Sequence, residues 1–361
     1  MFERRLYHDI DWAMIAALVA LCGMGLAMIY STTGGATRVF DTQLYGILLG
    51  AVVFAIALGF DYRSLADKSH FIYLAILALL VYVLLFGAVR GGSRRWIDLG
   101  VFNLQPSEFA ELGAALVLAK FFGESRRGTP STNDLIIGGV LTAIPIFMIY
   151  LQPDLGTAVT LLPVFFVVGF VAGMPLRVFG VLALAGVLAV PFAWQFALKD
   201  YQKERIETFL DPQQDAKGAG YQQIQARITV GSGGLWGKGF TKGTQGQLHF
   251  LPVAHNDFIF SVLAEEQGFA GVLVALGLYL FVILRALESA RLAKDRLGAY
   301  LVLGVLAGFS FQVVYNITMS AGLAPVKGLT LPLMSYGGSS MIATLAGFGL
   351  ILNVRMRRFT N

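Results

Sequence analysis

The sequence predicts an all-α polytopic membrane protein, and its composition and the spacing of its apolar blocks carry that prediction. Of its 361 residues, 56% are hydrophobic and 14% are charged, and the mean hydropathy is +0.69. Soluble proteins carry about 25% charged residues. The apolar residues come in blocks near or above the ~18 residues that cross a bilayer. Each block must be helical, because lipid offers no partner for an unpaired backbone group.

We expect ten transmembrane helices in one membrane domain that covers residues 1–361, with no separate soluble domain. The expected limits are 11–31, 42–60, 71–89, 107–123, 134–151, 155–173, 176–198, 258–285, 297–320 and 338–354. One loop is long, residues 199–257, between the seventh and eighth helices. No small-residue cleavage site follows the first apolar block, so the block is interpreted as a span and not as a removed signal peptide. The single cysteine, Cys22, excludes an internal disulfide and a cysteine metal site.

Lysine and arginine set the expected orientation. An even number of spans places both termini on one side, and the short loops on that side carry most of the cations. The positive-inside rule makes that side cytoplasmic, so the long loop lies outside. The net charge of +5 is spread over loops, and it therefore does not indicate nucleic-acid binding.

The short outer loop "RGGSRRWIDLGVFNLQPSE" breaks this charge bias with Arg90, Arg94 and Arg95. Arginine's planar fork suits phosphate oxygens. The alternative is a turn whose arginines face lipid headgroups.

The helix that follows this loop carries Glu108 and Glu111 on one face. Pro106 suits its first position, and Glu108 can fold back as a cap. Two carboxylates three residues apart on a helix repel one another, so one of them is protonated unless a cation lies between them. An interhelical structural ion pair is favoured over a chemical role for this pair.

Two further outer segments have a structural and a functional interpretation. Asp154 follows Pro153 and precedes a span, so a helix cap is favoured for it. In the long loop, amphipathic helical segments that lie on the membrane surface come first. The glycine-rich stretch "GSGGLWGKGFTKGTQGQ" follows with Lys238 and Lys242, and it either wraps polar ligand groups or is a flexible connection.

Asp257 directly precedes a membrane-length helix, where it is either an N-cap or a functional carboxylate. Glu265 and Glu266 follow two turns later, which suggests a polar pathway into the membrane. The last outer loop, "AGLAPVKGLTLPLMSYGGSS", is typical of a packed re-entrant segment. Its serines can satisfy exposed backbone groups, and Asn316 precedes it inside a span. These serines are Ser335, Ser339 and Ser340.

Six motifs in order resemble the shape, elongation, division and sporulation (SEDS) family of bacterial membrane proteins, over nearly the whole chain. The family's division branch shares most of these motifs, whereas the early "DW" and the "NLQPSE" stretch favour its elongation branch. The motifs are "DWAMI" near the start, "GGSRRWIDLGVFNLQPSEFAEL" at 91–112, "QPDLGTA" at 152–158, "GSGGLWGKGFTKGTQ" at 231–245, "FLPVAHNDFIFSVLAEEQGF" at 250–269 and "LPLMSYGGSS" at 331–340.

The resemblance implies a peptidoglycan glycosyltransferase of the bacterial cytoplasmic membrane that polymerises lipid II on the outer face during cell elongation. Its partners would be a class B penicillin-binding protein and other elongation-complex proteins, and a divalent cation, Mg or Mn, is a possible cofactor. Asp257 takes the place of the family's essential aspartate, as the base that activates a sugar hydroxyl. The residues expected to bind substrate are Arg94, Arg95, Lys238, Lys242, Gln245, His255 and Ser335.

The chain departs from the family pattern at four positions. Val253 and Asn256 replace a glutamate and a threonine, Ala226 replaces a serine, and Glu111 replaces a lysine. The last change removes the usual partner of Glu108. Two other function classes remain open: a flippase for lipid-linked precursors, which the in-membrane carboxylates would suit, and a membrane scaffold. Essential residues at the outer face favour the polymerase.

Overall fold

The computed structural model describes residues 10–90, 93–100, 103–125, 129–198, 200–215, 218–247, 250–251 and 254–359. A helix occupies each of the ten ranges predicted to span a membrane. These helices are α1 (Trp12–Thr32), α2 (Arg38–Gly59), α4 (Ser69–Phe86), α5 (Pro106–Gly123), α6 (Thr132–Leu151), α7 (Leu155–Val171), α8 (Leu176–Phe192), α12 (Ile259–Arg291), α13 (Arg296–Ser320) and α14 (Gly338–Met356). Within the described part of the chain, eight of the helices are long and apolar enough to cross a membrane; α5 and α7 are not among them.

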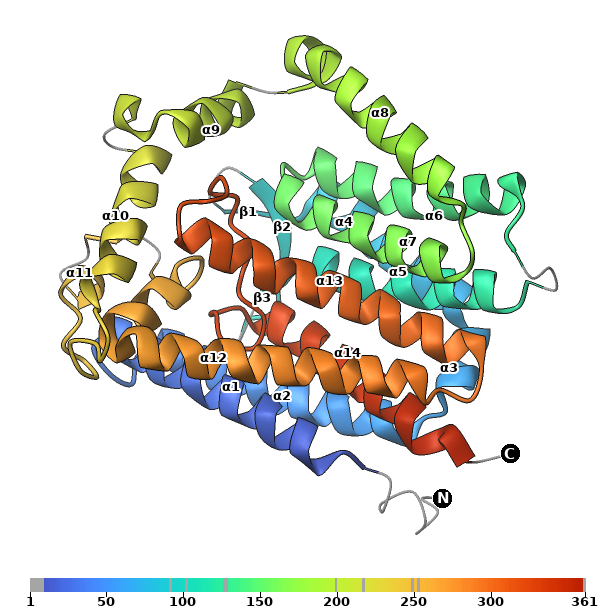
Figure 1. Cartoon of the computed structure of the whole chain (residues 1–361), viewed down its shortest axis with the longest axis horizontal. Helices are drawn as coiled ribbons and strands as arrows, with labels where there is room; N and C mark the ends of the chain where they lie inside the picture. Colours follow the sequence, from blue (N-terminus) through green and yellow to red (C-terminus); the bar gives the residue numbers. More distant parts are fainter. Residues whose placement is uncertain are drawn as a thin grey trace.

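The helices form one bundle in which α12, α13 and α14 are central (Figure 1). Helices α1 and α2 cover one side of this centre, and α4 to α7 cover the other. The start of α1 and the end of α14 lie at the same end of the bundle, where Arg355 Nη1 is 3.2 Å from Asp11 Oδ2. The bundle therefore has an end that carries both chain termini and an opposite end where the long loop emerges.

Burial differs sharply among the helices. Most of α14 is buried, including Asn353, whose amide donates to three backbone carbonyls at the end of α2 and just beyond it. In contrast, no described residue of α8 is buried, and Phe179 on α8 packs against Phe166 and Phe170 of α7. An apolar helix left uncovered by its own bundle is suited to lipid contact.

The prediction of an all-α chain omits a small sheet beside α4 and α5. Strands β1 (Ala88–Arg90), β2 (Ser93–Asp98) and β3 (Asn103–Leu104) pair antiparallel in the order β1-β2-β3. These strands are too short to give a clear alternation in sequence, so the segment reads as a loop. Because alternate strand residues face opposite ways, the sheet separates the side chains of Arg94 and Arg95.

The long loop is largely helical, as predicted for its first half. It contains α9 (Asp200–Leu210), α10 (Ala219–Ser232) and the single turn α11 (Thr244–Gln247), and α10 packs against α12 and α13. Figure 1 shows α8, α9 and α10 as an arch at the loop end of the bundle. Other short elements are α3 (Tyr62–Asp67), the π-helix η2 (Ala193–Ala197) and the 3-10 helices η3 (Pro212–Gln214) and η4 (Arg357–Phe359).

Helix α12 is broken at Gly268, and the glycine-rich loop fills the break. Gly268 has φ 66° and ψ −165°, which only glycine adopts without strain. Lys238 and Gly239 donate their backbone N–H groups to the carbonyls of Glu265 and Glu266, at 2.9 and 3.0 Å. Beyond the break, Phe269 and Ala270 donate to loop carbonyls at 2.9 and 3.1 Å. The loop is therefore part of the helix's hydrogen bonding, and it is not the flexible connection that the sequence left as one of two interpretations.

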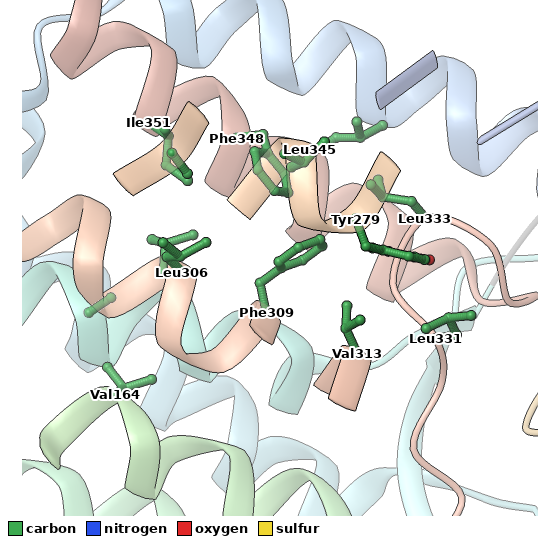
Figure 2. Packing of buried hydrophobic residues seen from close by; sticks show 14 of the residues in the cluster. Val164, Tyr279, Leu306, Phe309, Val313, Leu331, Leu333, Leu345, Phe348 and Ile351 are labelled. Atoms are coloured by element: carbon green, nitrogen blue, oxygen red, sulfur yellow. The ribbon is translucent and has the colours of Figure 1, made fainter. Parts of the chain in front are cut away.

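The segment after α13 is a packed re-entrant stretch, as predicted. Leu331, Leu333 and Met334 are fully or almost fully buried. A Cβ on Gly25 of α1 would lie 2.5 Å from the Cα of Met334, so only glycine permits this approach. Below the segment lies an aromatic core in which Phe309 and Phe348 meet edge to face, with ring centroids 4.8 Å apart (Figure 2). Tyr279 in this core donates its hydroxyl to the Pro332 carbonyl at 2.6 Å.

Candidate active site

A cavity of about 340 Å³ opens at the loop end of the bundle, and Asp257, Arg95, Asp154 and Glu108 line it together. Its walls come from the first turns of α2, α5 and α14, from β2, from the Asp257 segment and from residues 328–330. The volume lies in the ~300–1,000 Å³ range of small-ligand sites. Four charged groups that are far apart in sequence thus converge on one space.

The carboxylate of Asp257 faces this cavity, and it is not a helix cap. Phe258 occupies the N-cap position of α12, without a side-chain cap. Among the residues that the structure describes, none donates a hydrogen bond to the Asp257 carboxylate. Its backbone carbonyl, in contrast, accepts from the Asn316 amide at 2.9 Å, and the same amide donates to the Leu329 carbonyl at 2.7 Å. The main chain of Asp257 is fixed while its carboxylate is left available.

Electrostatics make this carboxylate suitable as a base near neutral pH. Burial raises the pKa of Asp257 to about 6, while the positive charges of Arg205 on α9 and Arg95 act in the opposite direction. A catalytic base is most effective when its pKa is close to the working pH. Asp257 is therefore mostly ionised at neutral pH, yet basic enough to accept a proton.

Arg95 is held at the cavity by Asp154. Its Nη1 lies 3.3 Å from Asp154 Oδ1, and its Nη2 donates to the Pro153 carbonyl at 3.1 Å. Asp154 is the N-cap of α7, as favoured from the sequence, since it accepts from Thr157 N. It also accepts from Gln105 Nε2 at 3.0 Å. Arg95 lines the cavity, so its guanidinium presents a fixed positive charge to an anion there, although its buried Nε has no described hydrogen-bond acceptor.

Arg94 is not part of this cluster. It lies on the other face of β2, is exposed, and donates to the Leu85 carbonyl at 3.4 Å. The predicted pair of phosphate-binding arginines is thus divided by the strand: only Arg95 lines the cavity.

His255 and Ser335 shape the cavity wall through the backbone. Ser335 Oγ donates to the Asn256 carbonyl at 2.6 Å and accepts from Leu331 N at 2.8 Å. The His255 carbonyl accepts from Tyr336 N at 2.9 Å, and burial lowers the pKa of the His255 imidazole. These bonds join the Asp257 segment to the re-entrant segment. Val253 lies outside the described residues.

Lys238, Lys242 and Gln245 are not brought to the cavity. Lys238 Nζ lies 2.6 Å from the fully buried Glu265 Oε1, which also accepts from the backbone N–H groups of Thr244 and Gln245 at 3.0 and 3.1 Å. Lys242 is exposed beside Gly239. Glu265 therefore organises the loop, and the polar pathway predicted from Asp257 through Glu265 and Glu266 is wrong.

The polar route into the bundle runs through Glu108 instead. A second, water-sized cavity of about 20 Å³ lies below the first, and Glu108 and Gln312 line both. Glu111 Oε2 accepts from Gln312 Nε2 at 2.9 Å, and a Cβ on Gly308 would meet that carboxylate. No described cation pairs with either glutamate, so the favoured interhelical ion pair is wrong. Glu108 does not cap α5 either, because the N–H of Gln105 donates to Ser339 Oγ at 2.9 Å.

The sequence interpretation missed several lining and neighbouring residues. Trp96, Gln105 and Thr42 line the cavity, Arg205 acts on Asp257 from α9, and Lys327 precedes the lining Gly328. Trp96 and Gln105 lie in the motif at 91–112 that was noted for its charged residues. Their place in that motif could therefore have indicated that they line the site. The sequence gives no such signal for Arg205, because its distance from Asp257 depends on where α9 lies relative to the bundle.

Within the described ranges, no group of three or more His, Cys, Asp or Glu side chains could hold a metal ion. The protein's own described residues therefore do not form a complete metal site there. The divalent cation stays an expectation from the resemblance.

The fold and cavity define a polytopic membrane protein with an acid–base site at one end of its helix bundle. Residues 12–359 match the model of the Cell cycle protein family of FtsW, RodA and SpoVE, and the chain belongs to this family. It is 38% identical over 349 residues to the peptidoglycan glycosyltransferase MrdB of Escherichia coli K12, which covers 97% of this chain and 94% of that protein.

Two solved structures are similar over almost their whole length. A chain from work on "Structural coordination of polymerization and crosslinking by a peptidoglycan synthase complex" superposes with a TM-score of 0.85 at 35% identity, covering 98% of this chain and 99% of that one. The rod shape determining protein RodA of Thermus thermophilus has a TM-score of 0.75 at 32% identity, with 98% of each chain covered.

Proposed function

We propose that the protein is an elongation-type peptidoglycan glycosyltransferase that polymerises lipid II at the outer face of the cytoplasmic membrane. One observation carries the proposal: Asp257 presents a carboxylate without a described hydrogen-bond donor to a cavity that also holds Arg95. Membership of the family and the names of the relatives support it.

In the proposed reaction, Asp257 removes the proton from a sugar hydroxyl of the acceptor. The oxygen attacks the anomeric carbon of the donor, the bond from that carbon to the pyrophosphate oxygen breaks, and polyprenyl diphosphate leaves. Direct displacement inverts the anomeric centre. Arg95 stabilises the charge that develops on the pyrophosphate, because its guanidinium is already oriented by Asp154. The proton remains on Asp257 until solvent takes it.

The proposal includes a topology of ten spans with both termini in the cytoplasm. The adjacency of Asp11 and Arg355 supports an even number of crossings. Cations concentrate in the short loops at the terminal end of the bundle, which the positive-inside rule places in the cytoplasm. The Asp257 cavity then opens on the outer side, where lipid-linked sugars are polymerised.

A class B penicillin-binding protein is the proposed partner. The related chain from a peptidoglycan synthase complex supports this, since that complex coordinates polymerization and crosslinking. A partner that crosslinks new strands would have to work on the same side of the membrane as the Asp257 cavity. Other elongation-complex proteins and a divalent cation remain part of the proposal.

The test is polymerisation of lipid II by the purified full-length protein, with and without its penicillin-binding protein and with Mg²⁺ or Mn²⁺. Wild type should give glycan ladders, and Asp257→Asn should give none while keeping its thermal unfolding midpoint. Ladders from both proteins would remove Asp257 as the base. Absence of ladders from both, together with lipid II translocation in vesicles, would favour the flippase.

A further inference from the structure

A second outer pocket lies at the end of α1 and plays no part in the chemistry proposed above. It has a volume of about 500 Å³, and residues Tyr30–Gly35 and Thr241 line it. This lining holds hydroxyl groups, glycine backbone and one aromatic ring, and none of these residues is charged. Such a lining offers hydrogen bonds and an apolar face without attracting ions.

Glu266 links the two walls of the pocket, the end of α1 and the loop residue Thr241, by hydrogen bonds. Ser31 Oγ on α1 donates to Glu266 Oε1, and the backbone N–H of Thr241 donates to Glu266 Oε2 at 3.3 Å. Glu266 is almost fully buried, so this junction is shielded from water. The pocket is therefore built into the fold and does not depend on a loose loop.

Thr241 has an unusual backbone. Its φ is 60°, in the left-handed region that a β-branched residue rarely adopts. Strain of this kind persists where the surroundings over-determine it, and it is concentrated at functional sites. Here the bond to Glu266 holds the residue, with its side chain at the pocket.

Two partly exposed aromatic rings adjoin the pocket. Tyr30 is 40% exposed and Phe240 is 44% exposed, and their rings are nearly parallel at 12°, with centroids 6.5 Å apart. Aromatic faces supply apolar contact area at low entropic cost, and the tyrosine adds a polar tip. A pyranose ring presents apolar C–H groups on its faces and hydroxyls around its rim. The aromatic rings of Tyr30 and Phe240, beside the hydroxyl groups of the pocket lining, are thus complementary to an uncharged sugar.

The pocket is connected to the Asp257 cavity by the start of α2. The Phe40 ring meets Tyr30 edge to face with centroids 5.7 Å apart, and Thr42, two residues further on, lines the Asp257 cavity. The start of α2 therefore borders both spaces. A strand that leaves the cavity over this end of α2 is led toward the second pocket.

We propose that the pocket formed by Tyr30–Gly35 and Thr241 is a subsite for the uncharged sugar units of the growing glycan strand. This inference rests on the proposed polymerase function and adds a strand-holding site to it. Holding the strand keeps it beside Asp257 between additions, so the subsite sets product length more than the rate of the first coupling.

The test uses full-length protein in nanodiscs, with chitotetraose as a soluble sugar probe and lipid II as substrate. Tyr30→Ala should weaken chitotetraose binding by about tenfold, as expected for loss of one aromatic contact. It should also shorten the glycan ladders several-fold at an unchanged initial rate of lipid II consumption. Thr241→Gly is a second variant that relieves the positive φ, so it removes the side chain without destabilising the backbone.

The matched control is Trp236→Ala, which removes an 83% exposed aromatic ring from the same loop outside the pocket. It should leave probe binding and ladder length unchanged. Equal chitotetraose binding by wild type, Tyr30→Ala and Thr241→Gly would overturn the subsite. So would unchanged sugar binding with loss of co-purified penicillin-binding protein, since the surface would then be a protein contact.

The outcome also separates the subsite from the polymerase proposal. Wild type that binds chitotetraose through Tyr30 but makes no polymer, with or without its partner, would refute the polymerase and keep the sugar site. Normal ladders from Tyr30→Ala and Thr241→Gly would refute the subsite alone.

Discussion

Asp257 and Glu265 lie about two helical turns apart around the start of α12, yet their surroundings are opposite. Glu265 is fully buried and accepts hydrogen bonds from a lysine and several backbone N–H groups. Asp257 is only partly buried, and no described donor reaches its carboxylate. A saturated carboxylate stabilises a fold, whereas an unsaturated one beside a cavity can accept a proton from a ligand. The comparison thus assigns structure to one acid and chemistry to the other.

The largest expected effect is on the rate, at Asp257. Asp257→Asn removes the base and should lower lipid II polymerisation by about 10²–10⁴-fold, the usual contribution of general base catalysis. Because the carboxylate has no described donors, its loss should leave the thermal unfolding midpoint close to that of wild type. Both quantities are measured on one preparation in the same detergent. A large fall in the midpoint would make Asp257 a structural residue like Glu265.

Glu265→Gln should show the reverse pattern, with a large effect on stability. It leaves Lys238 without its anion and weakens the bonds from the glycine-rich loop. Breaking a buried ion pair costs about 3–5 kcal/mol of unfolding free energy. Denaturant unfolding measures this loss, and Glu204→Gln on the exposed face of α9 is the control, with an expected change within about 0.5 kcal/mol. A neutral result at Glu265 would remove the contrast between the two acids.

Asn316→Ala tests how the main chain of Asp257 is held. The carbonyls of Asp257 and Leu329 each lose an amide donor, which costs about 1–3 kcal/mol and should lower kcat about tenfold. Thr318→Ala is the control, because its exposed hydroxyl bonds only within α13. Unchanged kcat for Asn316→Ala would show that the position of Asp257 does not depend on this amide.

The smallest effect concerns pH. Since burial raises the pKa of Asp257 to about 6, polymerisation should fall as the pH drops below about 6 and Asp257 becomes protonated. Arg205 lowers this pKa, so Arg205→Gln should leave it higher and move the acid limb to higher pH, by less than about one unit. Arg205 is exposed, so the shift should shrink in high salt. A shift toward lower pH would contradict the assignment.

Features that depend on neighbouring residues were predictable from the sequence. The helices follow from the apolar blocks, the Asp154 cap from its place before a span, and the packed re-entrant segment from its prolines, glycines and serines. The family resemblance pointed to Asp257. In each case the signal and the structure it produces lie within a few residues of one another.

Features that depend on distant partners were not predictable in this way. The pairing of the glycine-rich loop with the break at Gly268 is one such feature, because nothing in the loop's own residues shows it. Glu265 and Lys238 are 27 positions apart, so their ion pair has no local pattern. Arg94 and Arg95 are adjacent in sequence, and only the strand between β1 and β3 reveals that one faces the cavity and the other does not.

The pairing of the glycine-rich loop with α12 also bears on how the chain is assembled. The loop is synthesised before α12, and the peptide groups at the break at Gly268 pair with residues 234–239. Beyond the break, residues 269–291 of α12 make about 35 Å of helix, which alone matches the ~30 Å apolar thickness of a bilayer. The part of α12 before the break therefore depends on the glycine-rich loop for its hydrogen bonds, and the two segments fold as a single unit.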